Sequence, residues 1–98
     1  MVALLDQINH ENHTVYTTPG IQALMEQRNE SANKYLDLHF SDQWGDLTPD
    51  DIQANVEALE DGALRVFSSY KLEGEEVKVW VITEADREST TVLLPEEY

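Results

Sequence analysis

The sequence predicts one α+β domain, with about three helices followed by a three-stranded antiparallel β-meander and possible space for an extra strand near the N-terminus. Two observations carry this prediction. Hydrophobic residues recur at three- and four-residue steps up to residue 61, and at two-residue steps from residue 64 to residue 94. A chain of 98 residues, 41% of them hydrophobic, can bury one modest core, so we expect a single domain, 1–98, in which 1–13 is a flexible or edge segment.

Local signals mark where the helices begin and end. After a short expected strand at 14–17, Thr18-Pro19 and Thr48-Pro49 each place a capping hydroxyl before a first-turn proline, and Ser31 is a third candidate cap. Gly62 is expected to end the third helix. The expected inward faces are Ile21, Leu24 and Met25; then Ala32, Tyr35, Leu36, His39 and Phe40; then Ile52, Val56 and Leu59.

Alternating side chains mark 64–71, 77–82 and 90–94 as the three strands of the meander. Phe67 and Trp80 fall on the sheet face opposite the valines. If helices cover that face, both rings belong to the core, which is the interpretation we favour. If no helix covers it, the rings form an exposed aromatic patch that would bind a partner.

Acidic charge is the strongest signal of composition. Twenty Asp and Glu face six Lys and Arg, which gives a formal net charge of -14. Such a surface repels nucleic acid and anionic membranes, so we expect a basic or nucleic-acid-binding protein as the partner, and no direct contact with nucleic acid or membrane. No Lys or Arg occurs from Tyr35 through Leu64. The predicted acidic partner-binding face comes from this segment: Asp42, Asp46, Asp50, Glu57, Glu60 and Asp61.

Three further features concern location and local pairing. The chain has no cysteine, which excludes disulfides, thiolate metal sites and a cysteine nucleophile. It also begins without a basic segment and a long apolar run, so no signal peptide is expected, and a reducing cytoplasm is the predicted location. Arg87, inside the charged stretch Glu84–Glu88, is expected to form local ion pairs across a turn.

Candidate chemical groups are few. His39, Trp44 and Asp46 form a possible loop site, because a histidine near a carboxylate can act as a general base. His39 nevertheless falls on the apolar stripe of its helix, which favours a structural role. His10 and His13 are three residues apart but lack a third metal ligand. We therefore predict no catalytic residue, no metal and no cofactor.

Several motifs together resemble a known family. They are Thr18-Pro19-Gly20, H-x-x-x-x-W-G-D-L from His39 to Leu47, D-x-x-x-N from Asp51 to Asn55, S-x-Y from Ser68 to Tyr70, and W-V-I-T-E-A-D-R-x-x-T-T-V-L-L-P-x-x-Y from Trp80 to Tyr98. The chain resembles short acidic proteins carried by bacterial plasmids and integrative elements. The resemblance covers roughly residues 14–98 and implies a mobile-element setting in bacteria, without implying a reaction.

Setting and charge together suggest a protein-binding inhibitor of host defence, of the kind that imitates DNA against restriction or CRISPR enzymes. Two alternatives remain open. One is a small barnase- or RelE-like ribonuclease, with His39, Arg65, Thr83 and Thr91 as its candidate residues, although six cations are few for an RNA-binding cleft. The other is a regulatory module that forms a homodimer or binds a partner through Trp44 or Trp80.

Overall fold

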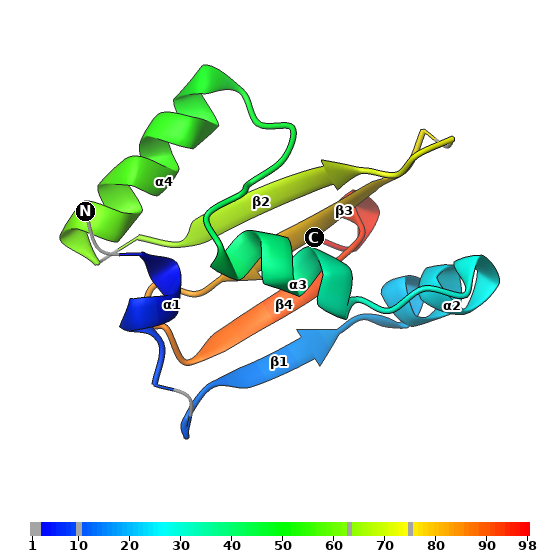
Figure 1. Ribbon diagram of the computed structural model, residues 1–98, viewed down its shortest axis with the longest axis horizontal. Helices are drawn as coiled ribbons and strands as arrows, with labels where there is room; N and C mark the ends of the chain where they lie inside the picture. The colour runs from blue at the N-terminus through cyan, green and yellow to red at the C-terminus, as the bar shows by residue number, and fades with distance from the viewer. Residues whose placement is uncertain (1–2, 10, 63, 75) are drawn as a thin grey trace.

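A computed structural model describes residues 3–9, 11–62, 64–74 and 76–98 (Figure 1). The helices are α1 (Leu4–Gln7), α2 (Pro19–Arg28), α3 (Asn33–Phe40) and α4 (Pro49–Asp61), with a 3-10 turn η1 (Pro95–Glu97) near the C-terminus. The strands are β1 (Thr14–Thr17), β2 (Val66–Lys71), β3 (Lys78–Thr83) and β4 (Ser89–Leu93). The α+β class predicted from the sequence is confirmed.

The sheet differs from the predicted meander. Strands β2, β3 and β4 do pair antiparallel in succession, but β1 joins them alongside β4 in parallel, which gives one mixed four-stranded sheet in the order β1-β4-β3-β2. The pairing of Thr14 with Ser89 and of Thr17 with Val92 connects opposite ends of the chain. Residue alternation reveals that a segment is a strand but does not reveal such a distant partner.

The helix ends follow local chemistry. The hydroxyls of Thr18 and Thr48 accept hydrogen bonds from backbone N–H groups three residues on, at 3.3 Å and 3.2 Å, as predicted. Gly62 ends α4 in the left-handed region at φ 73°. Ser31 does not cap α3 directly, because the helix begins two residues later at Asn33 and the serine hydroxyl accepts from the Asn33 N–H in the turn before it.

The four helices pack against one face of the sheet, and α3 crosses that face in Figure 1. The larger core cluster joins α2 and α3 to the strands and consists of Ile21, Met25, Tyr35, Leu36, Tyr70, Leu72, Val79, Val81 and Val92. A smaller cluster joins α1 and α4 to the start of β2 and consists of Leu4, Ile8, Ala58, Leu59 and Val66. The buried strand residues of both clusters lie on this same face.

The inward face of α4 differs from the prediction. Ile52 is 42% exposed, while the polar Asn55 is only 1% exposed. The Asn55 amide donates to the Phe67 carbonyl at 2.7 Å and accepts from the Phe67 N–H at 2.9 Å. The Asn55 amide therefore pairs with the backbone donor and acceptor of Phe67 at the outer edge of β2, as a neighbouring strand would. This explains why a polar residue occupies a buried helical position.

The Trp44–Asp46 segment completes the cover over this edge. The Ser69 N–H donates to the Trp44 carbonyl at 3.0 Å, and the Asp46 N–H donates to the Ser69 carbonyl at 2.7 Å. Gly45 lies between them at φ 77°, and a Cβ there would lie 2.2 Å from the Ser69 carbonyl oxygen. Both the backbone conformation and the close approach therefore require glycine in this motif.

The opposite face of the sheet carries Phe67 and Trp80. Phe67 pairs with Ile82, and Trp80 pairs with Leu93, so these side chains point away from both core clusters. None of the described helices α1–α4 packs there, and the ring that contacts Trp80 from outside the strands belongs to Tyr98. The favoured interpretation of Phe67 and Trp80 as core is therefore wrong. All four helices are used on one face, so the aromatic face is left open.

Candidate functional site

His39 lies inside the helix-covered face of the sheet. Its side chain is 0% exposed, with Nδ1 2.6 Å from the Ser68 hydroxyl and Nε2 2.9 Å from the Thr83 hydroxyl. The Thr83 hydroxyl is in turn 2.6 Å from that of Thr90. The register of β2, β3 and β4 places these hydroxyls in one row, so the strands themselves position a polar chain through the core.

This chain of hydrogen-bonded polar side chains continues to His13, in the loop before β1. His13 Nε2 lies 2.8 Å from the Thr90 hydroxyl, and His13 Nδ1 lies 2.8 Å from the Arg87 carbonyl oxygen. A carbonyl can only accept, so His13 Nδ1 carries a proton and donates it. In neutral His13 the other nitrogen is then an acceptor, so the Thr90 hydroxyl donates to it.

The remaining hydrogen bonds then have one consistent direction. Because Thr90 uses its proton on His13, Thr83 donates to Thr90 and accepts from His39 Nε2–H. Ser68 accordingly donates to His39 Nδ1. Every nitrogen of the two rings has a partner, so no free ring nitrogen of His39 remains to act as a general base.

Burial makes this neutral arrangement stable. Desolvation by burial, with a smaller contribution from the nearby His13, lowers the pKa of His39 to about 3. His39 therefore stays uncharged at neutral pH. The structural role that the sequence favoured for this residue is consistent with its contacts.

The predicted loop site is not assembled. Trp44 packs beside the smaller core cluster, and the Asp46 carboxylate lies 3.4 Å from Lys78 Nζ. No hydrogen bond, ion pair or ring contact among the described residues links His39 to either of them. His13 serves the polar chain, and His10 lies outside the described residues.

The candidate ribonuclease residues are divided between the two sheet faces. Thr83 does contact His39 on the covered face. Thr91 pairs with Ile82 on the open face, and Arg65 lines a hollow there with Ile82. The sheet separates the histidine from the arginine, so these four residues do not form one catalytic constellation.

The predicted acidic face is brought together in part. Asp50, Glu57, Glu60 and Asp61 are all exposed on α4, and the last three line one shallow hollow with Leu64. Asp46 pairs with Lys78 instead. Asp42 is half-buried, and its Oδ1 accepts from the Leu4 N–H at 3.4 Å. The acidic surface is thus one helix face, narrower than the sequence predicted.

Arg87 is a buried residue and not a surface one. It is 8% exposed, and its guanidinium donates to the carbonyls of Leu64 at 2.7 Å and Ala58 at 3.0 Å. It also donates to the Glu84 carbonyl and to Gln7 Oε1. The expected ion pairs across the turn are therefore wrong. The guanidinium instead ties the C-terminal end of α4 to α1 and to the β3–β4 turn, because its five donors match several carbonyls at once.

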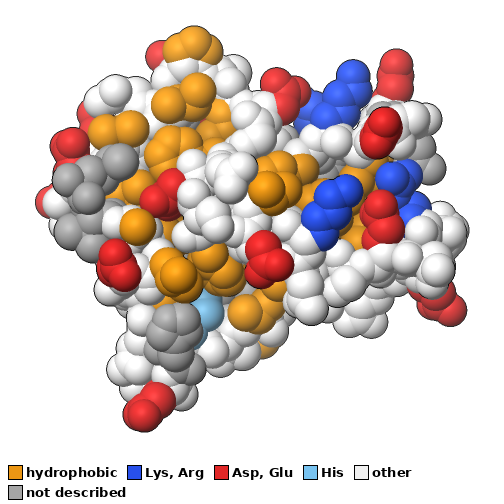
Figure 2. All heavy atoms as spheres, viewed as in Figure 1, with side chains coloured by type: hydrophobic (Ala, Val, Ile, Leu, Met, Phe, Trp, Pro, Cys, Tyr) orange, Lys and Arg blue, Asp and Glu red, His pale blue; other side chains and the backbone are white. Residues whose placement is uncertain are grey.

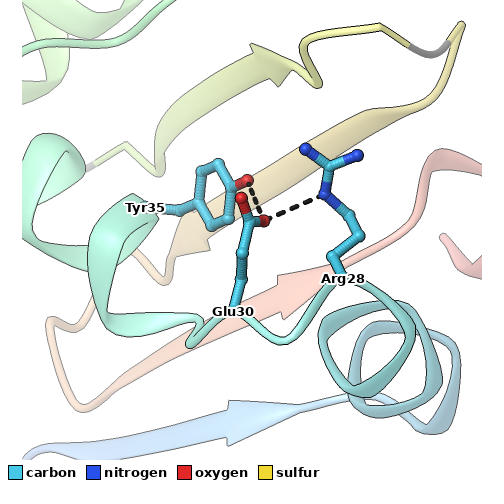
Figure 3. Close-up of polar contacts among 3 residues, drawn as sticks. All are labelled: Arg28, Glu30 and Tyr35. Atoms are coloured by element: carbon cyan, nitrogen blue, oxygen red, sulfur yellow. Dashed lines mark hydrogen bonds and ion pairs between the residues drawn. The ribbon is translucent and has the colours of Figure 1, made fainter.

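On the helix-covered face, the visible surface cations lie away from α4 (Figure 2). Figure 2 shows the visible Lys and Arg side chains at the α2 end of the helix-covered face, and none over α4. At that end Glu30 Oε2 accepts from Arg28 Nε at 3.0 Å and from the Tyr35 hydroxyl at 3.2 Å (Figure 3). Hydrogen bonding to Arg28 lowers the pKa of Glu30, while burial raises the pKa of Tyr35. On this face, acidic and basic side chains therefore stand together at the α2 end, while no Lys or Arg covers α4 (Figure 2).

The open face holds a hollow of about 350 Å³, lined by Arg65, Phe67, Trp80, Ile82 and Tyr98. The Phe67 and Trp80 rings meet edge to face, with centroids 5.1 Å apart, and Trp80 and Tyr98 do the same at 5.9 Å. The Arg65 guanidinium lies 5.8 Å from the centre of the Tyr98 ring. The alternating pattern in the sequence places Arg65, Phe67, Trp80 and Ile82 on one face. No sequence pattern indicates that Tyr98 lies over that face.

A scan against protein-family models finds no match, and searches of curated proteins and of solved structures find no significant similarity either. None of the described helices combines the length and apolar character needed to cross a membrane. In the parts of the chain that the structure describes, no group of three or more His, Asp or Glu side chains is arranged to hold a metal ion.

Proposed function

We propose that this chain is a protein-binding module that engages a basic, nucleic-acid-binding protein through the outer face of α4. The observation that carries the proposal is a row of exposed carboxylates on one helix, from Asp50 through Glu57 to Asp61. Among the residues that the structure describes, none of them forms an ion pair. They are free to meet the cations of a partner.

The spacing of these carboxylates concentrates their field. Twenty carboxylates spread evenly over a protein of this size would lie about 17 Å apart, beyond the screening length of ~8–10 Å at physiological salt. Glu57 and Asp61 are one helical turn apart, about 6 Å along the axis. Like charges at this spacing destabilise a helix by about 0.2–0.5 kcal/mol per pair. The cations of a basic partner would offset that repulsion when the partner binds.

The inner side of the same helix explains how the repulsion is tolerated. Buried Arg87 donates to the Ala58 carbonyl near the negative end of α4, and so places a positive charge beneath the acidic surface. Asn55 and Leu59 anchor the helix on the sheet. The carboxylates are thus held on a fixed scaffold, which lowers the entropic cost of binding.

The partner class follows from the setting implied by the resemblance. A protein of a mobile element that blocks a host restriction or CRISPR nuclease needs to compete with DNA for basic surface. Carboxylates on a rigid helix can occupy positions that phosphates would otherwise take. We therefore propose an anti-defence inhibitor of the DNA-mimic type, with α4 as its contact surface.

Displacement of labelled duplex DNA from purified restriction and CRISPR nucleases tests this proposal. The variant Glu57→Gln/Glu60→Gln/Asp61→Asn removes three charges from α4, while Glu11→Gln/Glu73→Gln/Glu88→Gln removes three exposed charges elsewhere. We expect displacement at ~50 mM salt that weakens by about tenfold or more near ~300 mM, since charged contacts are screened by salt. The α4 variant should lose about 5- to 150-fold in affinity, at roughly 0.3–1 kcal/mol per charge.

The matched control decides the role of α4. Because both variants change net charge equally, nonspecific repulsion or attraction affects them alike. Equal weakening by the two variants would assign the effect to net charge and overturn the proposed surface. Absence of displacement from every nuclease at ~50 mM salt would overturn the proposed function.

A further inference from the structure

We propose that the hollow on the open sheet face binds a small planar aromatic anion of the aryl carboxylate class. The ring would lie among Phe67, Trp80 and Tyr98, and the carboxylate would meet Arg65. This inference concerns a different surface from α4 and does not rest on the function proposed above.

The lining of the hollow fits an aromatic ring. Ile82 is buried at 7% exposure beneath the hollow, and three aromatic rings stand around it. Phe67 is tilted by 86° to Trp80, and Trp80 by 70° to Tyr98, so the rings form walls instead of a flat layer. The volume of about 350 Å³ lies at the lower end of the range for small-molecule sites, which matches a ligand of one or two fused rings.

Arg65 supplies the charge selectivity. Arg28 is paired with Glu30, and Arg87 is buried on carbonyl oxygens, whereas Arg65 lies over the Tyr98 ring. No described carboxylate pairs with Arg65, although the chain holds twenty of them. Its guanidinium fork can therefore take a carboxylate through two parallel hydrogen bonds.

The surrounding face favours the same sign of charge. The strand residues that register places on it include no acid: Thr14, Tyr16, Phe67, Ser69, Lys71, Lys78, Trp80, Ile82, Ser89, Thr91 and Leu93. Lys78 is paired with Asp46, so Arg65 and Lys71 supply the positive charge of this face. Three aromatic rings could in principle hold an organic cation. Arg65 already lies over the Tyr98 ring, however, and would repel a second cation there. Shape and charge together select an aromatic anion.

Three probes of one shape and different charge test the inference: 1-naphthoate, neutral 1-naphthalenemethanol and 1-naphthylmethylammonium. Binding to the full chain is followed by NMR through the indole N–H of Trp80, with the indole of Trp44 as an internal reference. We expect naphthoate to shift the Trp80 signal and to bind about tenfold or more tighter than the alcohol, because a charge-assisted hydrogen bond is roughly twice as strong as a neutral one. The ammonium probe should bind most weakly.

Variants of Arg65 separate charge from shape. Arg65→Gln should bring naphthoate down to the affinity of the alcohol, while Arg65→Lys should retain part of the preference because a lysine attracts a carboxylate without the two-point fork. Equal binding of all three probes, tightest binding of the ammonium, or no shift at millimolar naphthoate would each overturn the inference. A Trp80 signal that moves with protein concentration alone would also overturn it, because a second copy would then cover the face.

Discussion

The two faces of the sheet are built from alternating residues of the same strands, yet they treat polar groups in opposite ways. On the covered face, His39, Ser68, Thr83 and Thr90 are fully buried or nearly so, and each has a hydrogen-bond partner. On the open face, Arg65 stands beside aromatic rings without a carboxylate partner among the described residues. His39, the candidate general base, thus has both ring nitrogens hydrogen-bonded inside the core. Phe67 and Trp80, which were expected in the core, lie on the open face instead.

Substitution of Arg87, which is buried, and of Arg65, on the open face, should give the largest difference in the free energy of unfolding. Arg87→Gln leaves the buried Ala58 carbonyl and the part-buried Leu64 carbonyl without their donor, so we expect a loss of about 3–5 kcal/mol in the free energy of unfolding. Arg65→Gln removes an exposed charge and should change the same quantity by no more than about 0.5 kcal/mol. Urea unfolding at pH 7.5 measures both.

A loss of 3–5 kcal/mol could consume most of the stability of a domain this small, which is about 5–15 kcal/mol in typical cases. Arg87→Lys keeps one charged donor group and should fall between the wild type and Arg87→Gln. If Arg65→Gln proved as damaging as Arg87→Lys, the open face would be part of the folded core.

Adjacent residues of β3 repeat the contrast with apolar side chains. Val81 is 0% exposed in the larger core cluster, so Val81→Ala should lower the free energy of unfolding by about 2–3 kcal/mol through lost burial and the remaining cavity. Trp80→Leu removes a much larger ring from the open face and should cost only about 1 kcal/mol. Thermal and urea unfolding of the two variants would contradict the assignment of faces if Trp80→Leu were the more damaging.

The parts of the fold that were predictable depend on nearby residues. Thr18, Thr48 and Gly62 act within one helical turn, so their roles could be recognised from sequence. The parallel pairing of β1 with β4 joins segments at opposite ends of the chain. The spacing of hydrophobic residues does not predict such a pairing. Asn55 was missed because a buried amide that closes a strand edge looks like any exposed polar residue in the sequence.

The candidate sites show the same limit. Local spacing on α4 correctly grouped Asp50, Glu57, Glu60 and Asp61 on one exposed face. Asp46 does not belong to this group, because it forms an ion pair with Lys78, which is distant in the sequence. Whether an aromatic residue faces a helix or solvent depends on where all the helices pack, and this property of the whole fold decides the role of Trp80.

Acidic pH should act on the covered face through His39. Its pKa falls from about 6.5 in the unfolded chain to about 3 in the fold, so the unfolded state binds more protons between these values. The stability linked to this residue is complete above pH 6.5 and declines as pH falls. The unfolding constant should rise about tenfold per pH unit, which amounts to about 2 kcal/mol between pH 6.5 and pH 5.

The variant His39→Gln isolates this contribution, since it removes the titrating ring and keeps a side chain that can both donate and accept. The lowered pKa values of Glu30 and Glu97 act below their ordinary value of 4.5, outside the chosen range. Urea unfolding at several pH values should show a shallower slope for His39→Gln between pH 6.5 and pH 5. Parallel slopes for the two proteins would mean that His39 is hydrated or charged in the fold.

The smallest expected effect on stability is a reversal of the hydrogen bonds that join His13 to His39. With His13 neutral, its proton lies on Nδ1 and that of His39 on Nε2. When His13 gains a second proton, its Nε2 must donate to Thr90, and the hydroxyls of Thr90 and Thr83 then turn to donate toward His39. His39 should respond by moving its own proton to Nδ1 and donating to Ser68. The number of hydrogen bonds stays the same, so the free energy of unfolding should change little through this step.

Nitrogen-15 spectra of the imidazole rings report which nitrogen carries the proton. As pH is lowered until the His13 signals show an imidazolium, the signals of His39 should change from the Nε2–H form to the Nδ1–H form while that ring remains neutral. Thr90→Val breaks the chain between the rings and should leave His39 in the Nε2–H form throughout. A wild-type His39 that keeps one form while His13 charges would show that the hydroxyls do not transmit the change. The covered face would then hold separate hydrogen bonds, each satisfied on its own, instead of one connected chain.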